Sequence, residues 1–260
     1  MLIDFFKYNI CMNLQTTDKK FNGFLRDIRT LFQKQKGRIL FQKRNTLKLL
    51  NYKEEKYVVK SFKVPHLLNQ VVYRFFRASK AQRSYENAVR LQKLHINTPV
   101  PIGYVEFPSF LLFKESYYVS EFFDYDFEIR ALLAESAFEQ REEILKAFVA
   151  FSFNLHNQGV FHVDFSPGNI LIKKKDSLYE FSLIDVNRMK FLPFTDELRM
   201  KAFAKLSASK EDRVFIIEEY LKLHPMNDAL AHEHMESFHQ EHQEYIENKK
   251  RLKRLKKARQ

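Results

Sequence analysis

Residues 161–172 read FHVDFSPGNILI, and residues 183–188 read LIDVNR. The first stretch comes after Arg141–Asn157, in which apolar side chains recur at helical spacing. Its apolar end and the start of the second stretch are rich in Ile and Leu, which predicts a short hairpin. We therefore expect Asp164 and Asn169 on a loop that joins a helix to a hairpin.

The spacing of these polar residues suits the transfer of a phosphoryl group. Such a reaction needs a carboxylate beside the accepting hydroxyl and oxygen ligands that hold Mg²⁺ on the phosphates. Asp164 and Asn169 have the D-x-x-x-x-N spacing of a kinase catalytic loop, with His162 two residues before the aspartate. Asp185 ends an apolar strand, where a second magnesium ligand is expected. In the alternative interpretation, Asp164 only begins a turn and Asn169 only caps a strand.

Two charged residues of the first half are candidates to complete such a site. Lys60 comes after Tyr57-Val58-Val59 in a predicted strand, which resembles the kinase strand whose lysine contacts the α- and β-phosphates. Glu86 lies on the following helix, from which its carboxylate could hold that lysine. Lys63 competes with Lys60 but lies beyond the apolar run. Taken alone, a lysine after a strand or a glutamate on a helix is usually solvated.

The glycine-rich loop of most kinases has no counterpart in this sequence. The basic turn Gln42–Thr46 stands where that loop should fall, and the whole chain has five glycines. No G-x-x-x-x-G-K pattern occurs, which excludes a P-loop kinase. Arg44 of this turn is a candidate phosphate contact, and a solvated turn explains it equally well.

The order of the predicted elements indicates an α+β fold with a strand-rich first half and a helical second half. The predicted helices are 18–34, 79–94 and 141–157, and the predicted strands of the first half are 38–42, 46–50, 56–62, 102–107 and 117–122. With a boundary near Asp124, we expect four segments. These are an N-terminal helical extension (1–36), a small β-rich N-lobe (37–123), a compact helical C-lobe (124–247) and a basic C-terminal tail (248–260).

The formal net charge is +12, and the basic run Lys249–Arg259 contributes strongly to it. We expect the run to meet an anionic membrane surface, where each basic residue contributes about 1 kcal/mol. Nucleic acid is a less favoured partner, because no aromatic residues interleave the run, and a solvated tail is the alternative. The single cysteine, Cys11, and an opening stretch without a signal or spanning pattern favour a cytoplasmic protein.

Together these segments resemble the lipopolysaccharide core kinases, the Kdo and heptose kinases, which have a two-lobed protein-kinase-like fold. The resemblance spans roughly residues 38–206 and rests on the pieces 58–63, 83–87, 98–103, 162–172 and 183–188. It implies that Asp164 is the catalytic base, assisted by His162, and that Asn169 and Asp185 bind Mg²⁺. It also implies that Lys60 with Glu86 anchors the phosphates of ATP, and that Glu121, Phe122 and Phe123 form the hinge against adenine.

The resemblance implies ATP- and Mg²⁺-dependent phosphorylation of a sugar hydroxyl, Kdo or heptose, in the inner core of lipopolysaccharide. The acceptor would be linked to lipid A at the cytoplasmic membrane face. Val163 stands where regulated protein kinases have arginine, and Asp185-Val186-Asn187 replaces D-F-G, which favours a small or lipid-linked acceptor over a peptide. Two alternatives stay open: a RIO-like or aminoglycoside/choline-type kinase, which shares the H-x-D-x-x-x-x-N loop, and an inactive pseudokinase that serves as a binding module.

Overall fold

The computed structural model describes residues 12–34, 37–64, 77–108, 113–176 and 178–258. The chain divides into two compact units. The first extends to Asp124 and includes the short segment Asp185–Asn187, and the second comprises Tyr125–Ile184 and the chain from Arg188 onward. Each unit has its own core and is described separately.

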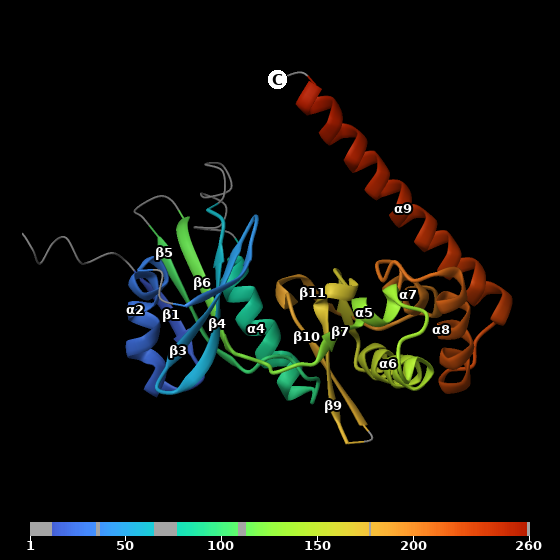
Figure 1. The fold of residues 1–260 in the computed structure, drawn as a ribbon, viewed down its shortest axis with the longest axis horizontal. Coiled ribbons are helices and arrows are strands. Elements are labelled where there is room, and N and C mark those ends of the chain that lie inside the picture. Colours follow the sequence, from blue (N-terminus) through green and yellow to red (C-terminus); the bar gives the residue numbers. More distant parts are fainter. Residues whose placement is uncertain (1–11, 35–36, 65–76, 109–112, 177, 259–260) are drawn as a thin grey trace, which may run out of the picture. The chain divides into compact units, whose positions relative to one another are not determined.

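The first unit is built on a six-stranded antiparallel sheet (Figure 1). Its strands, in spatial order, are β1 (Asn13–Thr16), β5 (Pro101–Pro108), β6 (Phe113–Glu121), β4 (Glu55–Phe62), β3 (Thr46–Tyr52) and β2 (Arg38–Gln42). Five of these strands fall where the sequence predicts them, with every end within four residues of the predicted one. Strand β1 was not predicted, and it lies in the segment expected as an N-terminal helical extension, ahead of the predicted helix.

Two helices cover opposite faces of this sheet. The 3-10 helix η1 (Lys19–Phe21) leads into α2 (Asn22–Gln33), whose apolar face packs on one side together with Val59 of β4. Helix α4 (Lys80–Lys93) packs on the other side, where Phe62 of β4 meets Tyr85. Because successive side chains of a strand point to opposite faces, Lys60 projects on the side of α4. Its ammonium lies 5.3 Å from the centroid of the Phe62 ring.

The start of α4 is set by its local sequence. Ser79 has an extended backbone, and its hydroxyl accepts the N–H of Gln82 at 3.0 Å, which satisfies one of the donors that every helix start leaves unpaired. The helix ends at Lys93: His95 has a left-handed backbone (φ 54°), and the N–H of Ile96 donates to the carbonyl oxygen of Leu91 at 2.9 Å, as at many helix ends. The predicted helix, 79–94, is therefore confirmed to within one residue at each end.

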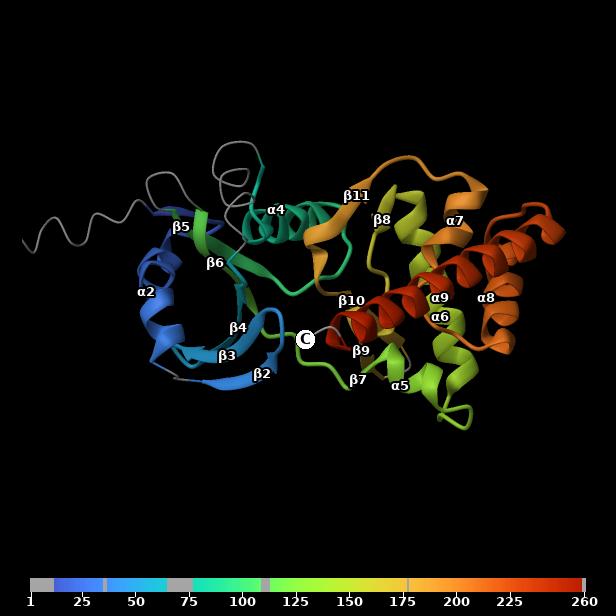
Figure 2. The same ribbon diagram turned by 90° about the horizontal axis from the view of Figure 1, so that it is seen from above.

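The second unit combines short strands with helices (Figure 2). Its strands are β7 (Phe127–Glu128), β8 (Val160–His162), β9 (Ile170–Lys175), β10 (Leu178–Leu183) and β11 (Met189–Phe191). Its helices are α5 (Ile129–Ala134), α6 (Arg141–Asn157), η2 (Pro167–Asn169), α7 (Asp196–Ala202), α8 (Lys210–Leu223) and α9 (Asp228–Ala258), and η3 (Val186–Arg188) crosses the unit boundary. The observed α6 has the bounds that the sequence predicts, and the predicted hairpin is β9 with β10.

Phenylalanine rings form the centre of this unit. Phe148 of α6 stacks on Phe165 at a centroid distance of 5.8 Å, and it contacts Phe181 of β10 and Phe203 after α7 at 6.0 and 6.2 Å. Aromatic pairs at such distances add stabilisation beyond the area that they bury. The cluster joins the loop that contains Asp164 to the helices around it.

Helix α9 has a packed half and an exposed half. Near its start, Ala231, Met235 and Phe238 are buried, and the helix lies against α7 and α8. Further along, Tyr245, Leu252 and other side chains are exposed, and the helix continues past its neighbours (Figure 1). No helix within the described residues has both the length and the apolar character that crossing a bilayer requires.

Candidate active site

Asp164 lies on the loop between β8 and η2, and His162 holds this loop in place. The Nδ1 atom of His162 accepts the N–H of Asp164 at 3.1 Å, and its Nε2 atom lies 3.0 Å from the carbonyl oxygen of Ile184. These two partners require the neutral ring with its proton on Nε2. Since the ring is buried and both nitrogens are engaged, His162 positions the Asp164 loop through its hydrogen bonds.

Asn169 closes the same loop from its other end. Its Nδ2 group donates to the carbonyl oxygen of Asp164 at 2.8 Å and to the Ser166 hydroxyl at 3.1 Å. The carbonyl can only accept, so the amide orientation is fixed and Oδ1 points away from these two partners. An amide oxygen of this kind is a ligand type that Mg²⁺ accepts.

Two cations lie beside the carboxylate of Asp164. The guanidinium of Arg188 forms an ion pair with Oδ2, and the ammonium of Lys205 lies 3.9 Å from Oδ1. Lys205 is fixed by a 2.6 Å hydrogen bond to the carbonyl oxygen of Val163. The Arg188 pair is half-exposed, so it contributes little to stability. Its effect is to orient the carboxylate, with Lys205 on the opposite oxygen.

In the first unit, Lys60 of β4 pairs with Asp185. The distance from Nζ to Oδ1 is 2.7 Å, and the lysine side chain is 12% exposed. Asn187 donates from Nδ2 to the same oxygen. Asp185 has a φ of 56°, in the left-handed region, where aspartate and asparagine are the most tolerant residues after glycine. This conformation turns the chain sharply directly after β10 and points the carboxylate at Lys60.

The expected ion pair between Lys60 and Glu86 is not formed. Glu86 is exposed on α4 and accepts a 2.8 Å hydrogen bond from Gln82, one helical turn earlier. The neighbouring Asn87 instead donates from Nδ2 to the carbonyl oxygen of Val186 at 2.7 Å. Because adjacent helical positions differ by about 100° in direction, the face that contacts the Asp185–Asn187 segment carries Asn87 and leaves Glu86 in solvent.

The remaining candidates belong to the first unit. Arg44 is exposed at the turn between β2 and β3. Glu121 ends β6 with an exposed side chain, and its N–H donates to the carbonyl oxygen of Val100 at 2.9 Å. The N–H of Phe122 donates to Lys56 at the same distance. Backbone hydrogen bonds thus occupy the N–H groups of both Glu121 and Phe122. Phe123, which is half-buried, is the next residue whose backbone could contact a ligand.

The family model of the lipopolysaccharide kinase (Kdo/WaaP) family matches residues 30–241. This chain belongs to that family. It is therefore a kinase, and its place in this family favours lipopolysaccharide biosynthesis over the RIO-like and aminoglycoside-type alternatives. Comparison with curated proteins gives no match.

Two solved structures are similar to the chain. The structure of WaaP in complex with acyl carrier protein gives a TM-score of 0.61 at 15% sequence identity, and the match covers 88% of this chain and 98% of that chain. A medium-resolution structure of the bifunctional kinase-methyltransferase WbdD gives a TM-score of 0.42 at 16% identity, covering 75% of this chain and 42% of that chain. The first match shows the protein-kinase-like fold, and the second is too weak to support an argument.

Several residues beside these candidates escaped the sequence analysis. Arg188 directly follows Asp185-Val186-Asn187, so its place in that motif was a usable signal. Asn87 lies in one of the family-like pieces, next to the glutamate that we chose. Lys205 has no comparable signal, because it reaches Asp164 only through the packing of the turn after α7.

Proposed function

We propose that this kinase transfers the γ-phosphate of ATP, with Mg²⁺, to a sugar hydroxyl of the lipopolysaccharide inner core, Kdo or heptose. The observation that carries the proposal is the Asp164 loop, in a chain whose family is that of lipopolysaccharide kinases. His162 and Asn169 fix the loop backbone on both sides of the carboxylate. A carboxylate held in this way is pre-positioned for an accepting hydroxyl.

The reaction assigns one role to each residue. Asp164 accepts the proton of the sugar hydroxyl as its oxygen bonds to the γ-phosphorus, and ADP leaves with the electrons of the broken P–O bond. Lys60 would exchange its partner, Asp185, for the α- and β-phosphates. Arg44 is a further phosphate contact, and the backbone around Glu121 and Phe123 would contact adenine.

The oxygen donors of Asn169 and Asp185 fit Mg²⁺, which prefers a few carboxylate or amide oxygens together with phosphate and water. When bound, the ion neutralises charge on the transferring phosphate. In the described structure Oδ1 of Asp185 is already engaged by Lys60 and Asn187. Lys60 would therefore have to shift toward the phosphates as the carboxylate takes up the cation.

Replacing Asp164 with Asn tests the proposal. The variant keeps the shape of the side chain and loses its basicity, so we expect no detectable transfer while ATP binding stays near the wild-type value. The readout is mass spectrometry of core oligosaccharide after incubation with protein, ATP and Mg²⁺. The matched control is Asp176→Asn at the exposed turn between β9 and β10, where φ is 51° and asparagine is tolerated.

Wild-type transfer rates in Asp164→Asn would overturn the assignment of the base. ATP binding by the wild-type protein without transfer to any glycan would favour the pseudokinase alternative.

We further propose that the protein works in the cytoplasm at an anionic membrane surface, with the end of α9 as the contact. This half of the helix carries the basic run and the exposed apolar residues Leu252 and Leu255. Basic helices with apolar side chains bind anionic bilayers through charge and shallow insertion. Such a contact would bring a lipid A-linked acceptor to the enzyme.

A further inference from the structure

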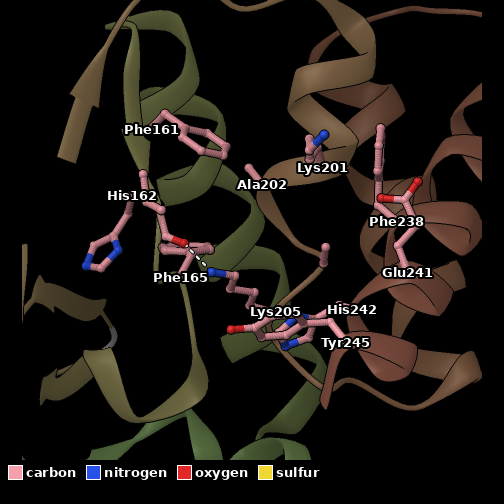
Figure 3. Close-up of a pocket in the computed structure, with 12 residues that line it drawn as sticks. Phe161, His162, Phe165, Lys201, Ala202, Lys205, Phe238, Glu241, His242 and Tyr245 are labelled. Carbon is pink, nitrogen blue, oxygen red and sulfur yellow. Dashed lines mark hydrogen bonds between the residues drawn. The ribbon is translucent and has the colours of Figure 1, made fainter. Parts of the chain in front are cut away.

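A cavity of about 380 Å³ lies beside the Asp164 loop, within the second unit. Its walls come from β8 and the following loop, from the end of α7 with the turn after it, and from the middle of α9 (Figure 3). This volume is in the range of sites for small molecules, roughly 300–1,000 Å³. None of the roles proposed above uses this cavity.

Lys205 connects the cavity to the carboxylate. It lines the cavity, and its ammonium donates to Val163 at 2.6 Å and lies 3.9 Å from Oδ1 of Asp164. Figure 3 shows its side chain reaching from the turn after α7 toward the loop. A lysine ammonium has three donors. One is used by the Val163 carbonyl, so the others can meet a ligand directly beside the proposed base.

The lining has the composition of a site for an acidic sugar. Phe161, Phe165, Phe238 and Tyr245 supply aromatic surface, on which the C–H face of a sugar ring can pack. Two lysines, Lys201 and Lys205, and two histidines, His162 and His242, line it, against one acidic residue, Glu241.

His242 is close enough to the loop to sense its charges. Burial lowers the pKa of His242, the charge of Lys205 lowers it further, and Asp164 opposes both effects. Its ring stacks with that of Tyr245 at a centroid distance of 6.4 Å. The part of α9 that lines the cavity is therefore in the electrostatic range of Asp164.

We propose that this cavity is the acceptor site, and that Lys205 binds an acidic group of the acceptor sugar while aromatic side chains of α9 contact the ring. The inference rests on the proposed function and adds the substrate class: a sugar with a carboxylate or phosphate near the accepting hydroxyl. An ion pair with Lys205 anchors the ring, and the neighbouring hydroxyl then faces Asp164.

Two matched pairs of acceptors test this site and separate the two sources of charge. One pair is the methyl glycoside of Kdo and its methyl ester, which lacks the negative charge. The other is heptose 7-phosphate and free heptose. For the wild-type enzyme we expect that, in one of the two pairs, the KM of the charged sugar is about 10- to 100-fold lower than the KM of its uncharged partner. This is the effect of one charge-assisted hydrogen bond.

In Lys205→Met this preference for the charged acceptor should vanish, with the loss mainly in KM. Lys210→Met, at an exposed position at the start of α8, is the control and should keep the preference. Tyr245→Ala is a second variant at a largely exposed position that tolerates truncation, and it should raise the KM of both members of each pair. Circular dichroism checks that each variant is folded.

Titration calorimetry with the same sugars, without ATP, separates failure of the site from failure of the proposed function. Binding of the charged sugar that depends on Lys205, in a protein that transfers no phosphate, would support the site and contradict the kinase reaction on these acceptors. Transfer without a preference for charge, or a preference that survives in Lys205→Met, would overturn the inference. No binding and no transfer with any of the four sugars would overturn both.

Discussion

Lys60 and Lys63 lie three residues apart, yet the structure gives them different surroundings. Lys60 is nearly buried beside Phe62 and pairs with Asp185, whereas Lys63 is exposed just beyond β4. If Lys60 holds the phosphates, Lys60→Met should lower kcat/KM for ATP by roughly 100-fold or more, the scale of losing one preorganised electrostatic contact. Lys63→Met, with the same change in charge and size, should stay within about twofold of wild type. An ADP-release assay on the two variants measures both, and equal losses would contradict the assignment.

The same residues show what a sequence can predict at this scale. Because side chains alternate between the two faces of a strand, the sequence of β4 was enough to place Lys60 on the face opposite the buried Val59. The partner of Lys60 was predicted wrongly, because the choice among Tyr85, Glu86 and Asn87 depends on the rotation of α4 against the sheet. That rotation is set by the packing of Tyr85 against Tyr104, at a centroid distance of 5.6 Å. Sequence periodicity alone does not determine it to within one residue.

Helices α6, α7 and α8 are joined by a buried polar network centred on Tyr220. Arg199 donates to the Tyr220 hydroxyl at 2.8 Å, so the hydroxyl donates onward to Nδ1 of His156, at 2.7 Å. Burial and, to a lesser extent, the nearby Arg199 charge together lower the pKa of His156 to about 3. Protonation of His156 would break the bond from Tyr220, so the folded state holds this ring neutral.

This network predicts a loss of stability in mild acid. Below the unfolded-state pKa of about 6.5, the unfolded chain binds a proton that the folded chain refuses, so stability falls as the pH drops toward 3. His156 should contribute about 1.4 kcal/mol per pH unit to this fall. Urea unfolding between pH 6.5 and 4.5 gives the free energy of unfolding at each pH. Its decrease per pH unit should be smaller by this amount in His156→Gln, whose amide oxygen can still accept from Tyr220. Equal slopes in the two proteins would rule out His156 as the source.

Among the elements, helices α2, α4 and α6 and the longer strands of the first unit were predicted, whereas the shortest strands were missed. Strands β1, β8 and β11 have only three or four residues, too few for an alternating pattern to stand out. Each exists because of a distant partner: β1 pairs with β5, and β8 with β11. Gly103 of β5 permits the first pairing, since a Cβ there would lie 2.5 Å from the carbonyl oxygen of Gln15.

For the whole molecule, the concentration of basic residues at the end of α9 predicts binding to anionic vesicles. Replacing Lys249, Lys250 and Arg251 with Gln should weaken binding to vesicles that contain phosphatidylglycerol by about 100-fold, given about 1 kcal/mol for each charge. The control removes the same number of charges elsewhere, with Lys173, Lys174 and Lys175 of β9 changed to Gln. Co-sedimentation measures both variants, and equal effects would mean that net charge rather than α9 controls binding.

At this scale the sequence predicted the α+β fold and the family correctly. The exposed half of α9 shows where its basic run lies.

The short segment Asp185–Asn187 belongs to the first unit although it lies between two parts of the second. The chain consequently passes from one unit to the other at three peptide bonds, after Asp124, Ile184 and Asn187. No single proteolytic cut can therefore release an intact first unit. A fragment that stops at Asp124 would lack the carboxylate that Lys60 contacts, and it would contain a nearly buried ammonium without its counter-charge. To be expressed by itself, the first unit would therefore have to include residues 185–187.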